Sequence, residues 1–164
     1  MKIFCRLLTL MLALLLCASC APRKQDWFAT FRQGFTAEVT GELCGERISA
    51  RISAEAVTAE GVLPLTVTFY APKALEGALL VRDATGNVWL ECYGMVLREG
   101  LGGLPDLLRC IPYEGAIDAV SLNEAGHTEV QSGEAVAEYL SDGTPYRLLF
   151  GDTVSLTVLD WQQK

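Results

Sequence analysis

Few side chains in this 164-residue sequence have the types and spacing that catalysis requires. His127 is the only histidine, so a Ser-His or Cys-His dyad would have to use it. It follows Ala125-Gly126 in a glycine-containing turn with no nucleophile motif beside it, so we expect a surface-loop histidine. Gly100-Leu101-Gly102-Gly103 is glycine-rich, but it lacks the Lys-Ser or Lys-Thr that completes a phosphate-binding loop. These residues indicate a flexible approach to a helix rather than a phosphate site.

Three cysteines, Cys44, Cys92 and Cys110, lie outside the N-terminal apolar segment. Their spacing matches no zinc signature and a fourth ligand is missing, so we expect neither a metal nor a cofactor. Export would permit one disulfide, but an odd number leaves one thiol over and no pairing is assigned. Cys92 lies in an apolar alternation and is expected to be a small buried residue.

The carboxylates also lack a catalytic pattern. Glu38, Glu42 and Glu55 alternate with apolar residues, so we expect them on a solvated convex face. A glycosidase-type acid and base would need two inward carboxyl groups at a set distance, which this spacing does not indicate. The sequence therefore predicts that the protein is not an enzyme.

Composition limits the class of protein. A mass of 17.8 kDa suits one compact domain. The 13 Lys and Arg residues against 20 Asp and Glu residues give a formal charge of −7, and the pI is about 4.7. Nucleic-acid binding needs clustered positive charge, so no nucleic-acid partner is expected.

The N-terminus has the pattern of an export signal. Lys2 and Arg6 precede an apolar run over residues 7–16, which is too short for a permanent transmembrane helix of about 20 residues. Ala18-Ser19-Cys20 resembles the small-small-Cys core of a bacterial lipobox, with Cys17 where leucine is most usual. An ordinary secretory cleavage near Ala18 is the alternative. We therefore predict a signal peptide over residues 1–19, lipidation of Cys20 and a tether over residues 20–26.

Lipidation would place the protein on the outer, extracytoplasmic face of the cell membrane. Removing Lys2 and Arg6 leaves 11 of the 13 basic side chains against 20 acidic ones, so the formal charge falls from −7 to −9. Such a surface is repelled by anionic lipid, and attached acyl chains would be needed to hold it on a bilayer. The predicted partner is thus a membrane, through the N-terminal anchor, with a monomeric domain outside it.

Residues 27–164 have the pattern of an antiparallel sheet. Period-two alternation over residues 35–43 and 47–56, separated by a short turn at Cys44-Gly45-Glu46, indicates a hairpin. Further strands are predicted over residues 63–70, 78–82, 88–93, 134–140, 146–150 and 153–161. The spacing of Leu104, Leu107, Leu108 and Ile111 predicts a short amphipathic helix within residues 101–112. Residues 113–133 are ambiguous, and we expect irregular structure plus one strand.

The order of these elements resembles the LolA, LolB and LppX lipoprotein-carrier superfamily, and most of all the small lipoproteins of Firmicutes in that class. The resemblance rests on the lipobox, the aromatic opening at Trp27-Phe28, the break over residues 69–77 and the closing Asp142-Gly143-Thr144-Pro145-Tyr146. It implies a mainly β (α+β) fold, in which one or two short helices plug the concave side of a curved, unclosed antiparallel half-barrel. In such relatives an apolar cavity between sheet and plug accepts acyl chains.

An apolar concave surface also follows from the alternation itself. If the apolar strand residues point inward, the residues lining such a cavity are Phe35, Val39, Ile48, Ile52, Leu65, Val67, Phe69, Leu156 and Val158. The same residues could instead meet the plug and leave no void, since close packing is the default in protein interiors.

Two functions remain open. The first is a binding or carrier module for a hydrophobic ligand, such as an acyl chain, a lipid or a lipidated protein. The second is a structural or interaction lipoprotein of the cell envelope, with a filled core and no ligand.

Overall fold

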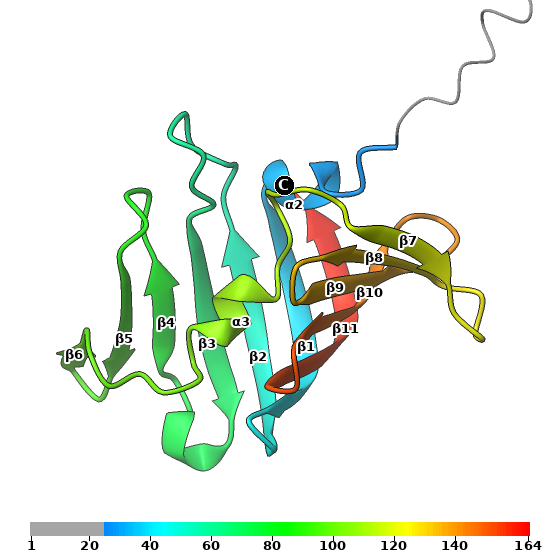
Figure 1. Ribbon diagram of the computed structural model, residues 1–164. Helices are drawn as coiled ribbons and strands as arrows, with labels where there is room; N and C mark the ends of the chain where they lie inside the picture. Colours follow the sequence, from blue (N-terminus) through cyan, green and yellow to red (C-terminus); the bar gives the residue numbers. More distant parts are fainter. Residues whose placement is uncertain (1–24) are drawn as a thin grey trace, which may run out of the picture.

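The computed structural model describes residues 25–164, and the predicted signal peptide, Cys20 and most of the tether lie outside the described residues. Within this range eleven strands form one antiparallel sheet in the order β6-β5-β4-β3-β2-β1-β11-β10-β9-β8-β7 (Figure 1). The strands are β1 (Phe35–Leu43), β2 (Glu46–Ala54), β3 (Leu65–Ala71), β4 (Leu79–Arg82), β5 (Val88–Cys92), β6 (Met95–Leu97), β7 (Ala119–Leu122), β8 (Thr128–Ser132), β9 (Ala135–Tyr139), β10 (Pro145–Phe150) and β11 (Val154–Gln163). The short helices are α2 (Ala29–Arg32), η1 (Lys73–Leu75) and α3 (Asp106–Arg109).

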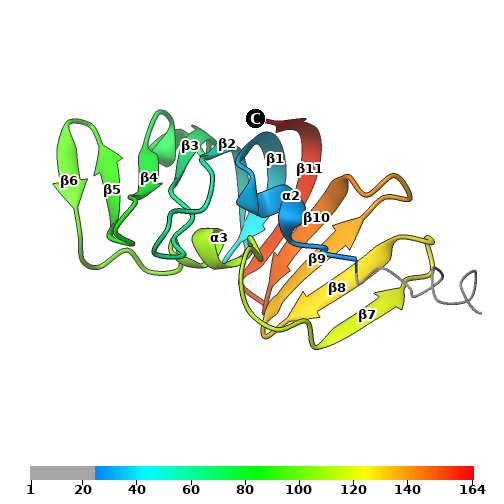
Figure 2. The ribbon, with the colours of Figure 1, turned by 90° about the horizontal axis from the view of Figure 1, so that it is seen from above.

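The sheet is open and strongly curved. Its two halves are each built from consecutive hairpins, and they join where β1 pairs with β11. Seen from above, the C-terminal strands turn away from the line of the N-terminal strands, and α2 and α3 lie inside the bend (Figure 2). The expected mainly β fold, an open sheet with short helices on its concave side, is confirmed. No helix among the described residues is long and apolar enough to cross a membrane.

The predicted hairpin of β1 and β2 forms because its turn residues allow the required backbone. Cys44 and Gly45 have φ values of 51° and 82°, and a two-residue hairpin turn with positive φ at both positions matches the twist of the strands. The two strands pair without interruption from Leu43 opposite Glu46, next to the turn, to Phe35 opposite Ala54 at the far end of the hairpin. Alternate residues of both strands are therefore buried on the concave side.

An aromatic cluster connects α2 to both halves of the sheet. Phe31 of α2 is fully buried, and its ring centroid lies 5.7 Å from Phe35 of β1, 5.5 Å from Trp161 of β11 and 6.3 Å from Tyr139 of β9. The Tyr139 hydroxyl donates a hydrogen bond of 2.8 Å to the main-chain oxygen of Trp27. This hydrogen bond holds the first residues of the domain against β9. Burial of the Tyr139 side chain raises its pKa above the usual value for tyrosine.

A single connection, which we call the strap (residues 98–118), runs from edge strand β6 to edge strand β7 across the concave side and carries α3 (Figures 1 and 2). Leu107, Leu108 and Ile111 bury their side chains under it, as their spacing predicts. The regular helix is shorter than expected, because only Asp106–Arg109 is helical between the glycines before it and Pro112 after it.

Residues 113–133 differ from the sequence-based prediction. They contain two strands, β7 and β8, which form a hairpin around a turn at residues 123–127. The turn is held by Asn123, whose side-chain oxygen accepts hydrogen bonds of 3.0 Å from the backbone N–H groups of Ala125 and His127. The Asn123 side chain thus forms hydrogen bonds that a backbone carbonyl would form in an ordinary turn. Such a turn leaves no periodic pattern of apolar residues in the sequence.

Candidate functional site

The nine residues predicted to line a cavity all lie on β1, β2, β3 and β11. Eight of them are at most 2% exposed and belong to the continuous core: Phe35, Val39, Ile48, Ile52, Leu65, Val67, Phe69 and Leu156. Val158 is half-buried and packs against that core. The structure therefore gathers the predicted residues into one apolar layer.

An apolar groove opens at one end of this layer and borders only Ile48 of the nine. It has a volume of about 490 Å³ and lies between the β1–β2 turn, η1 and the residues before α3. Its lining residues are Leu43, Cys44, Glu46, Ile48, Pro72, Ala74, Leu75, Gly103 and Leu104. Most of them come from turns and connections, where alternation gives no indication of which way a side chain points.

The groove wall is built from a close approach of two segments. A Cβ atom added to Gly103 would lie 2.3 Å from the Cys44 sulfur. The absence of a side chain at Gly103 therefore allows the strap to pack closely against the β1–β2 turn. Leu43 and Ile48 form the buried floor, while Cys44, Glu46 and Ala74 are exposed at the rim. Glu46 carries the only charge in the lining. This arrangement can bind hydrocarbon and offers few groups for chemistry.

In the part of the chain that the structure describes, Cys44, Cys92 and Cys110 are separate thiols that form no disulfide with one another. The sequence predicts a buried Cys92, but this residue is half-buried on β5, and the buried thiol is instead Cys110 at the end of α3. Burial raises the pKa of the Cys110 thiol to about 12, which keeps it protonated and unreactive. Cys44 is exposed at the groove rim.

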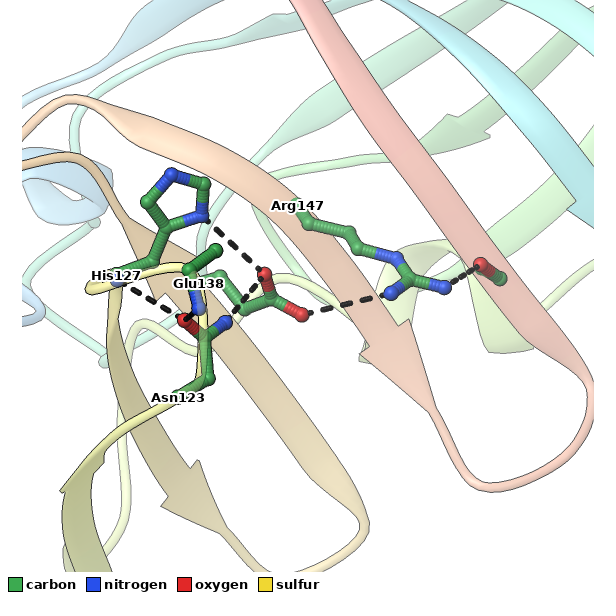
Figure 3. Close-up of polar contacts among 6 residues, drawn as sticks. Asn123, His127, Glu138 and Arg147 are labelled. Atoms are coloured by element: carbon green, nitrogen blue, oxygen red, sulfur yellow. Dashed lines mark hydrogen bonds and ion pairs between the residues drawn. The ribbon is translucent and has the colours of Figure 1, made fainter.

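A polar cluster that the sequence did not predict lies around Glu138, on the side of β9 away from the core (Figure 3). The Glu138 side chain is only 7% exposed, and one of its oxygens lies 3.6 Å from Nη1 of Arg147 on β10. The other accepts a hydrogen bond of 3.3 Å from Asn123 and lies 3.8 Å from Nδ1 of His127. Arg147 also donates a hydrogen bond of 2.9 Å to the hydroxyl of Ser155 on β11.

His127 is thus in the expected turn but is not simply a surface residue. Its side chain is 22% exposed, faces Glu138 and packs its ring 4.6 Å from that of Tyr146. The buried carboxylate accepts a hydrogen bond from Asn123 and lies within ion-pair distance of Arg147 on β10 and of His127 in the β7–β8 turn. The cluster therefore connects β9, β10 and the β7–β8 turn. Removing Arg147 would leave the charge of Glu138 buried in a low dielectric without its cationic partner.

A half-buried cation, Arg82, lies beneath the strap. Arg82 of β4 donates a hydrogen bond of 2.8 Å to the main-chain oxygen of Leu63, and its guanidinium carbon lies 4.9 Å from the ring centre of Tyr113. Its Nη2 atom is buried and has no hydrogen-bond partner within residues 25–164, and burial lowers the pKa of Arg82. Stacking of the Tyr113 ring on the Arg82 guanidinium group holds the strap against the N-terminal half of the sheet.

Residues 25–164 contain no group of three His, Cys, Asp or Glu side chains placed to hold a metal ion.

No family model and no curated protein matches this sequence. Among solved structures, an uncharacterised conserved protein from Thermus thermophilus is similar at 16% identity, with 82% of this chain and 81% of that chain covered and a TM-score of 0.49. MucB is similar at 15% identity over 84% of this chain and 57% of its own, with a TM-score of 0.48. MucB in complex with MucA(peri) gives 17% identity, 84% and 54% coverage and a TM-score of 0.43. The chain thus spans little more than half the length of the MucB chains to which it is similar.

Proposed function

We propose that this protein is an exported lipoprotein of the LolA-like class that binds the hydrocarbon part of a hydrophobic ligand in the groove beside η1. The observation that carries the proposal is an apolar groove of about 490 Å³ beside a continuous buried core. Its volume falls within the range of roughly 300–1,000 Å³ that is typical of small-molecule sites. A ligand would be bound at this end of the half-barrel rather than along its centre.

The driving force would be removal of apolar surface from water. Each buried methylene contributes about 0.8 kcal/mol, and the leucine and isoleucine side chains of the groove offer an apolar partner surface. Glu46 at the rim favours a ligand whose polar end is neutral over one that carries an anionic head, because like charges repel at short range. An uncharged acyl ester suits these features.

The ligand proposal is tested with octanoylglycerol and dodecanoylglycerol as probes, on the chain carrying Cys20→Ala so that no anchor competes for the groove. Four further methylenes are expected to tighten binding on the order of 100-fold, measured by isothermal titration calorimetry. Ala74→Trp, at the exposed rim, is expected to weaken binding of dodecanoylglycerol by about tenfold or more, because the indole occupies the groove. Equal binding of the two esters would exclude a hydrocarbon site.

The matched control is Ala59→Trp, which adds the same side chain at an exposed turn outside the groove lining. It should leave the affinity for dodecanoylglycerol unchanged. If both tryptophan variants bind as the parent chain does, or neither probe binds, the groove is not a ligand site and the envelope interaction role with a filled core is the better account.

The anchor is proposed at Cys20, which would hold an acidic domain at the membrane on the extracytoplasmic face. In cells supplied with an alkyne analogue of palmitate, the wild-type chain is expected to take up label and sediment with membranes, since two or three acyl chains anchor a protein stably. Cys20→Ala should abolish both label and sedimentation, whereas Cys17→Ala should retain them. Labelling that persists in Cys20→Ala would overturn the assignment of the anchor.

A further inference from the structure

Among residues 25–164, strand β7 is a free edge of the sheet. It pairs with β8 on one side only, and all four of its residues are exposed (Figures 1 and 2). Val120 is 50% exposed and Leu122 is 72% exposed, and Ile117 just before the strand is 39% exposed. An edge strand with exposed apolar side chains is a template on which another strand can pair.

The hydrogen-bond pattern shows which backbone groups are free. The N–H of Asn123 donates to the carbonyl of His127 over 3.0 Å, and residues 119–122 pair in the same register with residues 131–128. Hydrogen-bonded pairs recur at every second residue of an antiparallel ladder, so Ala119 and Ser121 also face β8. The N–H and C=O groups of Val120 and Leu122 therefore point outward, away from the sheet.

β7 lacks the features that usually protect an edge strand. It contains no lysine and no proline, and residues 119–122 pair with β8 without a register shift. The opposite edge, β6, has only three residues and is followed by Arg98, which stacks over Trp89 at 5.4 Å. Of the two edges, β7 is therefore the better template for an added strand.

The surroundings of β7 are acidic. Residues 110–146 contain no lysine or arginine but seven carboxylates: Glu114, Asp118, Glu124, Glu129, Glu134, Glu138 and Asp142. Glu138 is buried beside Arg147, Glu129 is half-buried and the other five are exposed. A second copy of this chain would bring the same negative charge to the edge and be repelled, whereas a basic segment would be attracted.

We propose that β7 accepts an extended, basic segment of a partner protein, in which apolar residues alternate with lysine or arginine, as an additional strand. Main-chain hydrogen bonds would form with Val120 and Leu122, whose side chains would pack against the apolar positions of the added strand. The basic positions would face the carboxylates around the edge. This surface is separate from the groove, so it stands or fails independently of the ligand proposal.

The probe is a synthetic peptide of alternating valine and lysine, titrated into the Cys20→Ala chain. It is expected to bind with an affinity that falls as salt is raised, and the amide resonances of Val120 and Leu122 should shift. A peptide with glutamate in place of lysine should not bind. A peptide of the same composition with its valines grouped should bind at least about tenfold more weakly, because only the alternating order matches a strand.

Val120→Pro is the decisive variant, because it removes an outward N–H group and leaves the hydrogen bonds to β8 in place. It should weaken binding of the valine-lysine peptide by about tenfold or more. The matched control is Val96→Pro on β6, where the replaced valine is 54% exposed, and it should bind as the parent does. Unchanged urea midpoints show that both variants fold.

Three results would overturn the proposal. The first is undiminished binding by Val120→Pro, and the second is equal binding of the grouped-valine peptide, which would indicate charge attraction alone. The third is self-association of the parent chain in sedimentation velocity that Val120→Pro abolishes, since β7 would then pair with a second copy.

Discussion

Replacing Phe31 with alanine is expected to lower the free energy of unfolding by about 4 kcal/mol. The ring is fully buried where α2 meets β1, β9 and β11, so alanine leaves a cavity bounded by both halves of the sheet. The loss also removes edge-to-face packing on Trp161, whose ring is perpendicular to that of Phe31. The free energy of unfolding of a domain of this size is about 5–15 kcal/mol, so the expected loss is a large fraction of its stability.

Urea unfolding followed by tryptophan fluorescence measures this effect, because Trp27 and Trp161 both lie in the cluster. Phe31→Leu keeps most of the side-chain volume and should cost about 1.5 kcal/mol or less. Leu159→Ala, where the leucine is 66% exposed, should change stability by about 0.5 kcal/mol at most. If Phe31→Ala costs no more than Leu159→Ala, the cluster does not hold the two halves together.

Gly41→Ala is expected to destabilise the domain by about 3 kcal/mol, although it adds a single methyl group. Gly41 lies in the middle of β1, opposite Leu156 of β11. An added Cβ would lie 2.0 Å from the backbone oxygen of Ser155 and 2.9 Å from the Cα of Leu156. Backbone atoms cannot rotate aside as the end of a side chain can, so β11 itself would have to move.

The same geometry explains the curvature of the sheet. The inward-facing residues of β1 are Phe35, Ala37, Val39 and Leu43, and Gly41 occupies the remaining position in that alternation. With no side chain there, the backbone of β11 passes over the concave face of β1, and the C-terminal strands turn as Figure 2 shows. The register shift between Glu38 and Val39 adds to the bend.

Gly103→Ala is the matched control for Gly41→Ala. Neither glycine has a positive φ, and the atom that obstructs a Cβ at Gly103 is the sulfur of an exposed cysteine, which can rotate away. We expect a cost of about 1 kcal/mol or less from Gly103→Ala in the same urea measurement. Equal costs for the two variants would show that β11 adapts to a side chain at position 41.

Several elements follow from local sequence because their causes are local. The β1–β2 and β4–β5 hairpins, the strands after residue 134 and the helical stripe of Leu107, Leu108 and Ile111 all lie where alternation, spacing and turn residues predict them. The failures have physical reasons. Strand β6 has only three residues, too few for a periodic signal, and the β7–β8 hairpin depends on the side chain of Asn123.

The candidate site is less predictable than the strands. Alternation identifies the nine expected residues as inward-facing, but the groove is lined mainly by Leu75, Leu104 and their neighbours on connections. Their positions depend on how the strap crosses the sheet. Glu138 carries no local signal of burial, because its partners His127 and Arg147 come from other strands and turns.

By itself, the sequence determined the strands other than β6 and the β7–β8 hairpin, which of their faces is apolar and where their turns occur, because period-two alternation and positive-φ glycines act within a few residues. It also contains the lipobox-like Ala18-Ser19-Cys20 on which the proposed anchor depends. Only the tertiary structure decided the bend at Gly41, the groove beside η1, the partners of Glu138 and the free edge at β7. These features arise from backbone approaches and pairings between residues far apart in the chain, and such contacts leave no period in the sequence.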